Sequence, residues 1–200
     1  MLLQKPFAYL VFILILCFGF QNTLAQEKLI KVVYKDGTIE KGLGRLASKN
    51  RLKFTPHLET KSQKISFDLI DHAIIGGNRY EQNGVKGEKK KIVAEVKVSG
   101  KVWLYEVSSY GYNASFPATG GAGNVGFGGY HYNINNFYVK YEGDSELIHL
   151  GSNQLFTKNF KQGASEFFKS CPELVEKIQN RELKRKDIIR IVRYFNLNCN

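Results

Sequence analysis

Cysteine is scarce in this sequence of 200 residues, which has three, at positions 17, 171 and 199. The four histidines, at 57, 72, 131 and 149, stand in no motif with any of them. A cysteine nucleophile needs a base partner nearby, so the sequence argues against cysteine catalysis. No grouping of metal-ligating residue types stands out, and we expect neither a metal nor another cofactor.

Long apolar runs are also lacking, apart from one near the N-terminus. Lys5 precedes a run of 14 uncharged residues, Phe7 to Phe20, and small or tolerated residues follow up to Ala25. A membrane-spanning helix needs about 20 apolar residues, so a cleavable signal peptide over residues 1–25 fits better than a membrane anchor. We expect cleavage before Gln26 and no transmembrane segment in the mature chain.

A lipid anchor is a weaker alternative. Leu16 directly precedes Cys17, where a lipobox has Gly, Ala or Ser. The expected location is therefore the periplasm, the outer-membrane surface or the extracellular space.

Acidic residues are few relative to basic ones, 18 against 29, so the formal net charge is +11. An exported protein with this charge suits anionic partners such as acidic glycans, lipopolysaccharide or nucleic acid. A solvated basic face that aids solubility is the alternative, because the basic residues form no dense stripe.

Residues 26–77 predict a small β module. Leu29 to Tyr34 is rich in β-branched residues, and Asp36-Gly37 is a strong hairpin turn signal before the next strand. Further short strands are predicted around Leu52 to Phe54, Ile65 to Phe67 and Ala73 to Ile75. This spacing is similar to that of Sm and SH3 barrels. We expect a polar linker at residues 78–91.

Residues 92–157 predict an antiparallel meander. Apolar residues alternate on both sides of Ser99-Gly100, and residues 137–141 and 147–150 form a second strand pair. Between these pairs lies a glycine-rich loop, residues 118–133. It contains a G-x-G-x-x-G match at 121–126, but no helix can open on the glycines that follow, so we expect no nucleotide binding.

Residues 158–200 have helical periodicity, so two or three short C-terminal helices are expected. Ser170 is the predicted N-cap of one, with Glu173 three residues on. Cys171 and Cys199 bracket the last two helices, and an even pair in an oxidising compartment predicts a disulfide between them. The predicted fold class is α+β: a mostly β barrel or meander followed by helices.

The hairpin around Ser99-Gly100, the segment Cys171-Pro172-Glu173-Leu174 and the ending Ile191 to Cys199 resemble uncharacterised exported proteins of Bacteroidetes-type bacteria. The resemblance implies an envelope or secreted location and no catalytic activity. It assigns no functional residue.

Three functions fit the sequence. The first is a non-catalytic interaction module of the envelope or of the secreted fraction, with an envelope protein or an anionic surface as its partner. The second is a polyanion binder, and its candidate anion contacts are Lys89, Lys90, Lys91, Lys184, Arg185, Lys186, Arg190 and Arg193. The third and least favoured is a hydrolase using Asp68, Asp71 and His72 as acid and base groups.

Overall fold

The protein is described by a computed structural model that covers residues 27–47, 50–56, 61–114, 129–153 and 160–199. The expected signal peptide and most of the glycine-rich loop, residues 118–128, lie outside the described residues. The predictions made for them stay predictions.

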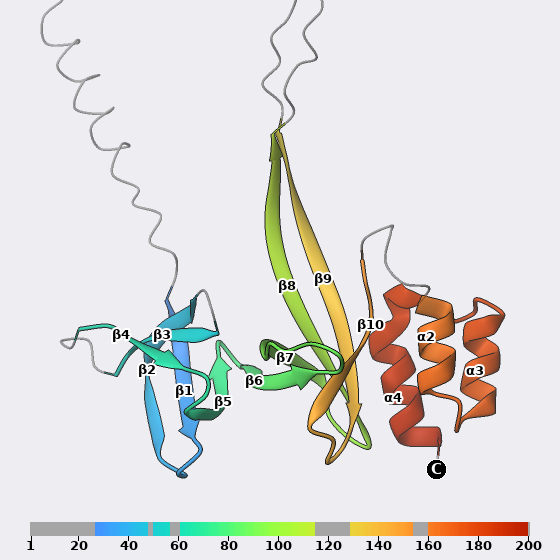
Figure 1. The fold of residues 1–200 in the computed structure, drawn as a ribbon, viewed down its shortest axis with the longest axis horizontal. Helices are drawn as coiled ribbons and strands as arrows, with labels where there is room; N and C mark the ends of the chain where they lie inside the picture. Colours follow the sequence, from blue (N-terminus) through green and yellow to red (C-terminus); the bar gives the residue numbers. More distant parts are fainter. Residues whose placement is uncertain (1–26, 48–49, 57–60, 115–128, 154–159, 200) are drawn as a thin grey trace, which may run out of the picture.

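One ten-stranded sheet dominates the fold, in the order β10-β9-β8-β7-β6-β5-β1-β2-β3-β4 (Figure 1). Neighbours in this order pair antiparallel, and β10 also pairs with β6 in parallel. The strands are β1 (Lys28–Tyr34), β2 (Ile39–Ala47), β3 (Arg51–Thr55), β4 (Gln63–Ser66), β5 (Ile70–Ile75), β6 (Asn78–Val85), β7 (Ile92–Val98), β8 (Val102–Ala114), β9 (Gly129–Tyr141) and β10 (Glu146–Ser152). The prediction of a mostly β fold with an antiparallel meander is confirmed.

Strands β1 to β5 share their own apolar core. Its fully buried members include Val32, Leu52, Phe54 and Phe67. The turn between β1 and β2 has Gly37 at φ +88°, a conformation that glycine adopts without a Cβ clash.

The prediction of a polar linker at residues 78–91 is wrong for the first eight of these residues, which form β6. The segment is polar, yet it pairs with β5 on one side and β7 on the other. Asn83 and Val85 are buried in it. Sheet pairing and side-chain hydrogen bonds stabilise this strand in place of an apolar stripe.

Strands β8 and β9 form a long hairpin that projects beyond the rest of the sheet (Figure 1). Residues 129–133, expected in the glycine-rich loop, belong to β9 and pair with residues 110–114 of β8. The loop is therefore shorter than predicted at its C-terminal side.

Three α-helices follow the sheet, with a 3-10 turn before the last, and they gather beside β8, β9 and β10 (Figure 1). The helical elements are α2 (Phe160–Phe167), α3 (Pro172–Gln179), η1 (Arg185–Asp187) and α4 (Ile188–Asn198). Their apolar faces pack on Leu104, Val139 and Leu150 of the sheet. Among the described residues, no helix has the length and apolar character needed to cross a membrane.

The predicted disulfide is present: Cys171 and Cys199 are bonded, with their Cα atoms 5.6 Å apart. The predicted cap is displaced by one residue. Cys171, not Ser170, is the N-cap of α3, and it makes no side-chain capping hydrogen bond. The disulfide therefore joins the start of α3 to the end of α4.

Asn196 attaches α4 to the sheet. Its amide Oδ1 accepts a hydrogen bond from the Val102 N–H, and its Nδ2 donates to the Val102 carbonyl, both at 2.8 Å. Gly100 lies so close that an added Cβ would be 2.6 Å from the Asn196 Nδ2 atom. The turn between β7 and β8 thus packs against α4, and the Asn196 side chain contacts the backbone of Gly100 and Val102.

Candidate functional site

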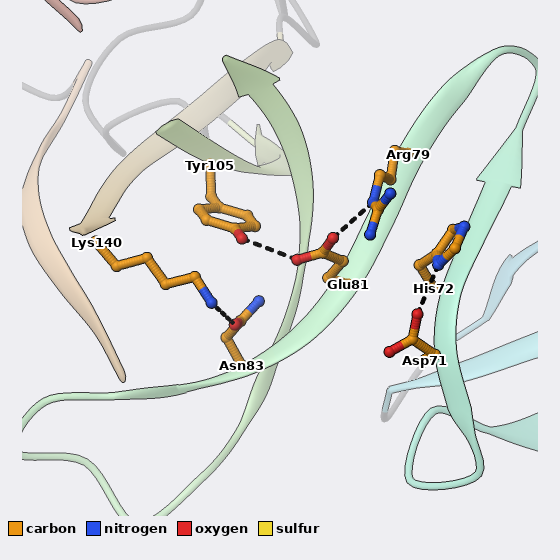
Figure 2. A network of polar contacts seen from close by, with 7 residues as sticks. All are labelled: Asp71, His72, Arg79, Glu81, Asn83, Tyr105 and Lys140. Carbon is orange, nitrogen blue, oxygen red and sulfur yellow. Dashed lines mark hydrogen bonds and ion pairs between the residues drawn. The ribbon is translucent and has the colours of Figure 1, made fainter. Parts of the chain in front are cut away.

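The three residues considered for hydrolysis, Asp68, Asp71 and His72, do not share hydrogen-bond partners. His72 Nδ1 lies 2.8 Å from Asp71 Oδ2 on β5 (Figure 2). Asp68 has other partners: the Ser66 hydroxyl donates to its Oδ2 at 2.9 Å. That hydrogen bond, followed by Gln82 and nearby lysines, lowers the Asp68 pKa. The structure brings together Asp71 and His72 and assigns Asp68 to the preceding turn.

A second polar group lies on one face of β6, where Arg79, Glu81 and Asn83 alternate along the strand (Figure 2). The Glu81 carboxylate accepts hydrogen bonds from Arg79 Nε at 2.6 Å and from the Tyr105 hydroxyl at 2.8 Å. Lys140 of β9 donates to Asn83 Oδ1 at 3.0 Å, and its Nζ lies 5.6 Å from the Tyr105 ring centroid. These contacts join strands β6, β8 and β9.

Tyr105 is fully buried at the centre of this network. Burial, together with the charge and hydrogen bond of Glu81, raises the pKa of its phenol. The folded protein therefore keeps Tyr105 protonated at a pH where an unfolded tyrosine ionises, so stability present below about pH 10 is lost as the pH rises further. Tyr80, which donates to Glu95, has its pKa raised to about 12 chiefly by burial and acts in the same direction.

Tyr105→Phe is expected to lower the free energy of unfolding by about 1–3 kcal/mol at pH 7, because Glu81 loses a hydrogen bond in a buried setting. Above pH 10 the free energy of unfolding should fall less steeply with pH in the variant than in the natural chain. The difference between the two slopes should reach up to about 1.4 kcal/mol per pH unit. Urea titrations between pH 7 and 11.5 measure both effects. Tyr110→Phe, which removes a hydroxyl from an exposed ring, is the control. Equal alkaline slopes for the natural chain and Tyr105→Phe would contradict the assignment.

A third cluster lies among the C-terminal helices, and we call it the basic hollow. It has a volume of about 530 Å³ and is lined by Phe160, Lys161, Ile178, Arg181, Leu183, Lys184 and Arg185. Four of these seven residues are cationic and none is acidic. Ile178 and Leu183 are almost completely buried, so the hollow has an apolar floor beneath its charges.

The backbone that carries three of these cations is fixed by hydrogen bonds after the end of α3. The Arg181 N–H donates to the Ile178 carbonyl at 3.2 Å, and Arg181 itself has a positive φ of 63°. The Leu183 N–H donates to the Lys177 carbonyl at 3.1 Å, and the Lys184 N–H donates to Asp187 Oδ2 at 3.0 Å. Arg181, Lys184 and Arg185 therefore belong to a hydrogen-bonded turn between α3 and α4.

No carboxylate among the described residues forms an ion pair with Lys161, Arg181 or Lys184. The Arg185 guanidinium donates to the Asn153 carbonyl at 3.4 Å. Four cationic side chains line this hollow, and none of its described lining residues is acidic, so their charge attracts an anionic group. The hollow is suited to bind an anionic group.

The predicted anion contacts occupy several places. Lys184 and Arg185 line the basic hollow, whereas Arg193 lines a different groove of about 340 Å³ with Lys97 and Leu197. Lys186 and Arg190 are exposed and line neither of these two spaces.

Lys89, Lys90 and Lys91 are exposed between β6 and β7. The Lys91 carbonyl accepts a hydrogen bond from the Asn50 side chain, in the N-terminal part of the sheet. This hydrogen bond links the three lysines to the N-terminal strands rather than to the helices.

Sequence reasoning missed Lys161 and Arg181. Each looks like an ordinary solvated charge on or after a helix, and only the packing of α2 against α3 brings them to one hollow. The position of Arg181, directly after the Asn180 cap of α3, was the one available signal of a sharp turn.

No group of three or more His, Cys, Asp or Glu in the described part of the chain is arranged to hold a metal ion. No family model, curated protein or solved structure gives a significant match to this chain.

Proposed function

We propose that the protein is an exported, non-catalytic binding module of the envelope or of the secreted fraction, and that it binds an anionic ligand in the basic hollow. One observation carries this proposal: Lys161, Arg181, Lys184 and Arg185 line one hollow, and none of the described residues that line it is acidic.

Two features support export. Residues 1–25 have the charge and the apolar run of a signal peptide. The Cys171–Cys199 disulfide is of a kind that persists in oxidising compartments and is rare in the cytosol. The resemblance to exported proteins of Bacteroidetes-type bacteria favours the same location, at an anionic surface or beside an envelope protein.

We also propose that strands β6 to β10 form a small barrel that supports the helices. Each of these strands pairs with its neighbour in the meander, and the parallel pairs Glu146–Gly84 and Leu147–Val85 join the last strand to the first. Such a scaffold would hold the packed face of the helices in place.

The double variant Arg181→Asn, Lys184→Gln is expected to weaken binding of a polyanion at least tenfold, because each hydrogen bond to a charged group contributes about 1.5–3 kcal/mol. Asparagine suits position 181 because it tolerates positive φ. Calorimetric titration of the mature protein with polygalacturonate measures the affinity. The slope of log K against log salt should also become shallower by up to about one per cation removed.

Lys186→Gln, Arg190→Gln is the matched control, since it removes the same charge from exposed positions outside the hollow. It should change the affinity by less than about threefold, because Lys186 and Arg190 do not line the hollow and act on its ligand only through long-range charge, which salt screens. Equal losses in the two double variants would show that net charge, rather than the hollow, attracts polyanions.

A further inference from the structure

A second hollow adjoins the basic one, and we call it the polar hollow. It also has a volume of about 530 Å³ and is lined by Lys161, Gln162, Ser165, Glu166 and Gln179. Lys161 lines both spaces, so the two hollows lie on either side of that residue. The polar hollow runs between α2 and α3.

The groups that line the polar hollow are mostly neutral donors and acceptors. Gln179 Nε2 donates to Ser165 Oγ at 2.6 Å, which fixes one amide and one hydroxyl across the two helices. Glu166 is paired with Lys169 at 2.9 Å. Amide and hydroxyl groups of this kind can donate hydrogen bonds to the hydroxyl groups of a sugar or accept them, and a carboxylate can accept them.

Building on the proposed function, we propose that the ligand is an acidic saccharide. Its carboxylate or phosphate group lies in the basic hollow, and its neutral hydroxyl groups lie in the polar hollow. Lys161, between the two, contacts the sugar that carries the charge.

Other polyanions fit these spaces less well. Single-stranded nucleic acid is bound by stacking its bases on aromatic side chains, and among the described residues that line the two hollows only Phe160 is aromatic.

A membrane surface also fits poorly. Peripheral attachment buries apolar side chains in the lipid interface. The large apolar side chains exposed in the described residues are Leu29, Ile39, Leu46, Leu69, Tyr110, Tyr141, Ile189 and Leu197. None of them lines either hollow.

The double variant Ser165→Ala, Gln179→Ala tests this assignment. It removes both partners of one hydrogen bond, so neither is left unpaired. Calorimetric titration of the mature protein should show about 3- to 10-fold weaker binding of an α-1,4-linked galacturonate oligosaccharide, the effect of losing neutral hydrogen bonds. Its affinity for inorganic phosphate should not change, because phosphate needs only the basic hollow.

Ser170→Ala, an exposed neutral change outside both hollows, is the matched control and should bind the oligosaccharide as the natural chain does. An uncharged galactose oligosaccharide should bind more weakly than the galacturonate. Thermal unfolding of each variant checks that the helices remain folded.

Unchanged galacturonate affinity in Ser165→Ala, Gln179→Ala, together with a loss in Arg181→Asn, Lys184→Gln, would overturn the saccharide assignment and leave the anion site standing. Tighter binding of an oligonucleotide or of phosphatidylglycerol vesicles at the basic hollow would overturn it as well. If neither phosphate nor galacturonate binds, both proposals fail.

Discussion

Replacing Cys171 and Cys199 together by serine should lower the free energy of unfolding by about 3–4 kcal/mol, the loop entropy of a 28-residue separation in the chain-entropy model. The disulfide ties the start of α3 to the end of α4, two helices of eight and eleven residues. Helices this short are marginal in water without tertiary support. Urea unfolding of the mature protein measures the difference.

Reduction of the natural chain is the internal control. Dithiothreitol should shift its urea midpoint toward that of the double serine variant, whose own midpoint should not respond to the reductant. Because both sulfurs are buried, reduction should proceed mainly through unfolded molecules. Two free thiols per chain in the denatured, unreduced protein would contradict the bridge.

Asn196→Ala is expected to lower the free energy of unfolding by about 2–4 kcal/mol, because two backbone groups of Val102 lose their partner. Val102 is fully buried, so water cannot readily replace the lost amide. The variant should also loosen α4 from the sheet. Amide hydrogen exchange then detects faster exchange in residues 188–198 together with the lower global stability.

Asn198→Ala is the matched control on the same helix. The Asn198 side chain donates to the Tyr194 carbonyl within the same helix, at the exposed end of α4. Its removal should change the free energy of unfolding by less than about 1 kcal/mol. Similar losses for Asn196→Ala and Asn198→Ala would show that the contact with Val102 does not hold the helix to the sheet.

Local signals in the sequence predict several elements correctly. Asp36-Gly37 marks the turn between β1 and β2, and Ser99-Gly100 marks the turn between β7 and β8. Each signal involves neighbouring residues, so one sequence is sufficient to detect it. The Cys171–Cys199 pair is also predictable, because only these two cysteines follow the apolar run near the N-terminus and the helices between them are short.

Strand β6 was missed because its stability comes from distant partners. Its side chains Arg79, Glu81 and Asn83 are polar, so no apolar alternation marks the strand. Glu81 is satisfied by Tyr105 of β8, and Asn83 by Lys140 of β9. The parallel contact between β6 and β10 is also long-range, and no local pattern in either segment indicates it.

The candidate site was predicted only in part, for a similar reason. Lys184 and Arg185 were predicted as anion contacts because they belong to a run of basic residues. The same run includes Lys186, which does not line the hollow. Lys161 comes from another helix. Lys161 comes close to the other three cations only because of how α2 packs beside α3. Helical periodicity predicts which face of each helix is buried, but it does not predict how the two helices are placed relative to each other.

The measurement that tests the anion site most directly is a ¹⁵N-edited NMR titration of the mature protein with the galacturonate oligosaccharide. We predict saturable shifts concentrated at the amides of Lys161, Arg181, Lys184 and Arg185, and smaller shifts at Ser165 and Gln179. Shifts that do not saturate and are spread over exposed lysines such as Lys89 to Lys91, with none concentrated at the hollow, would contradict the account.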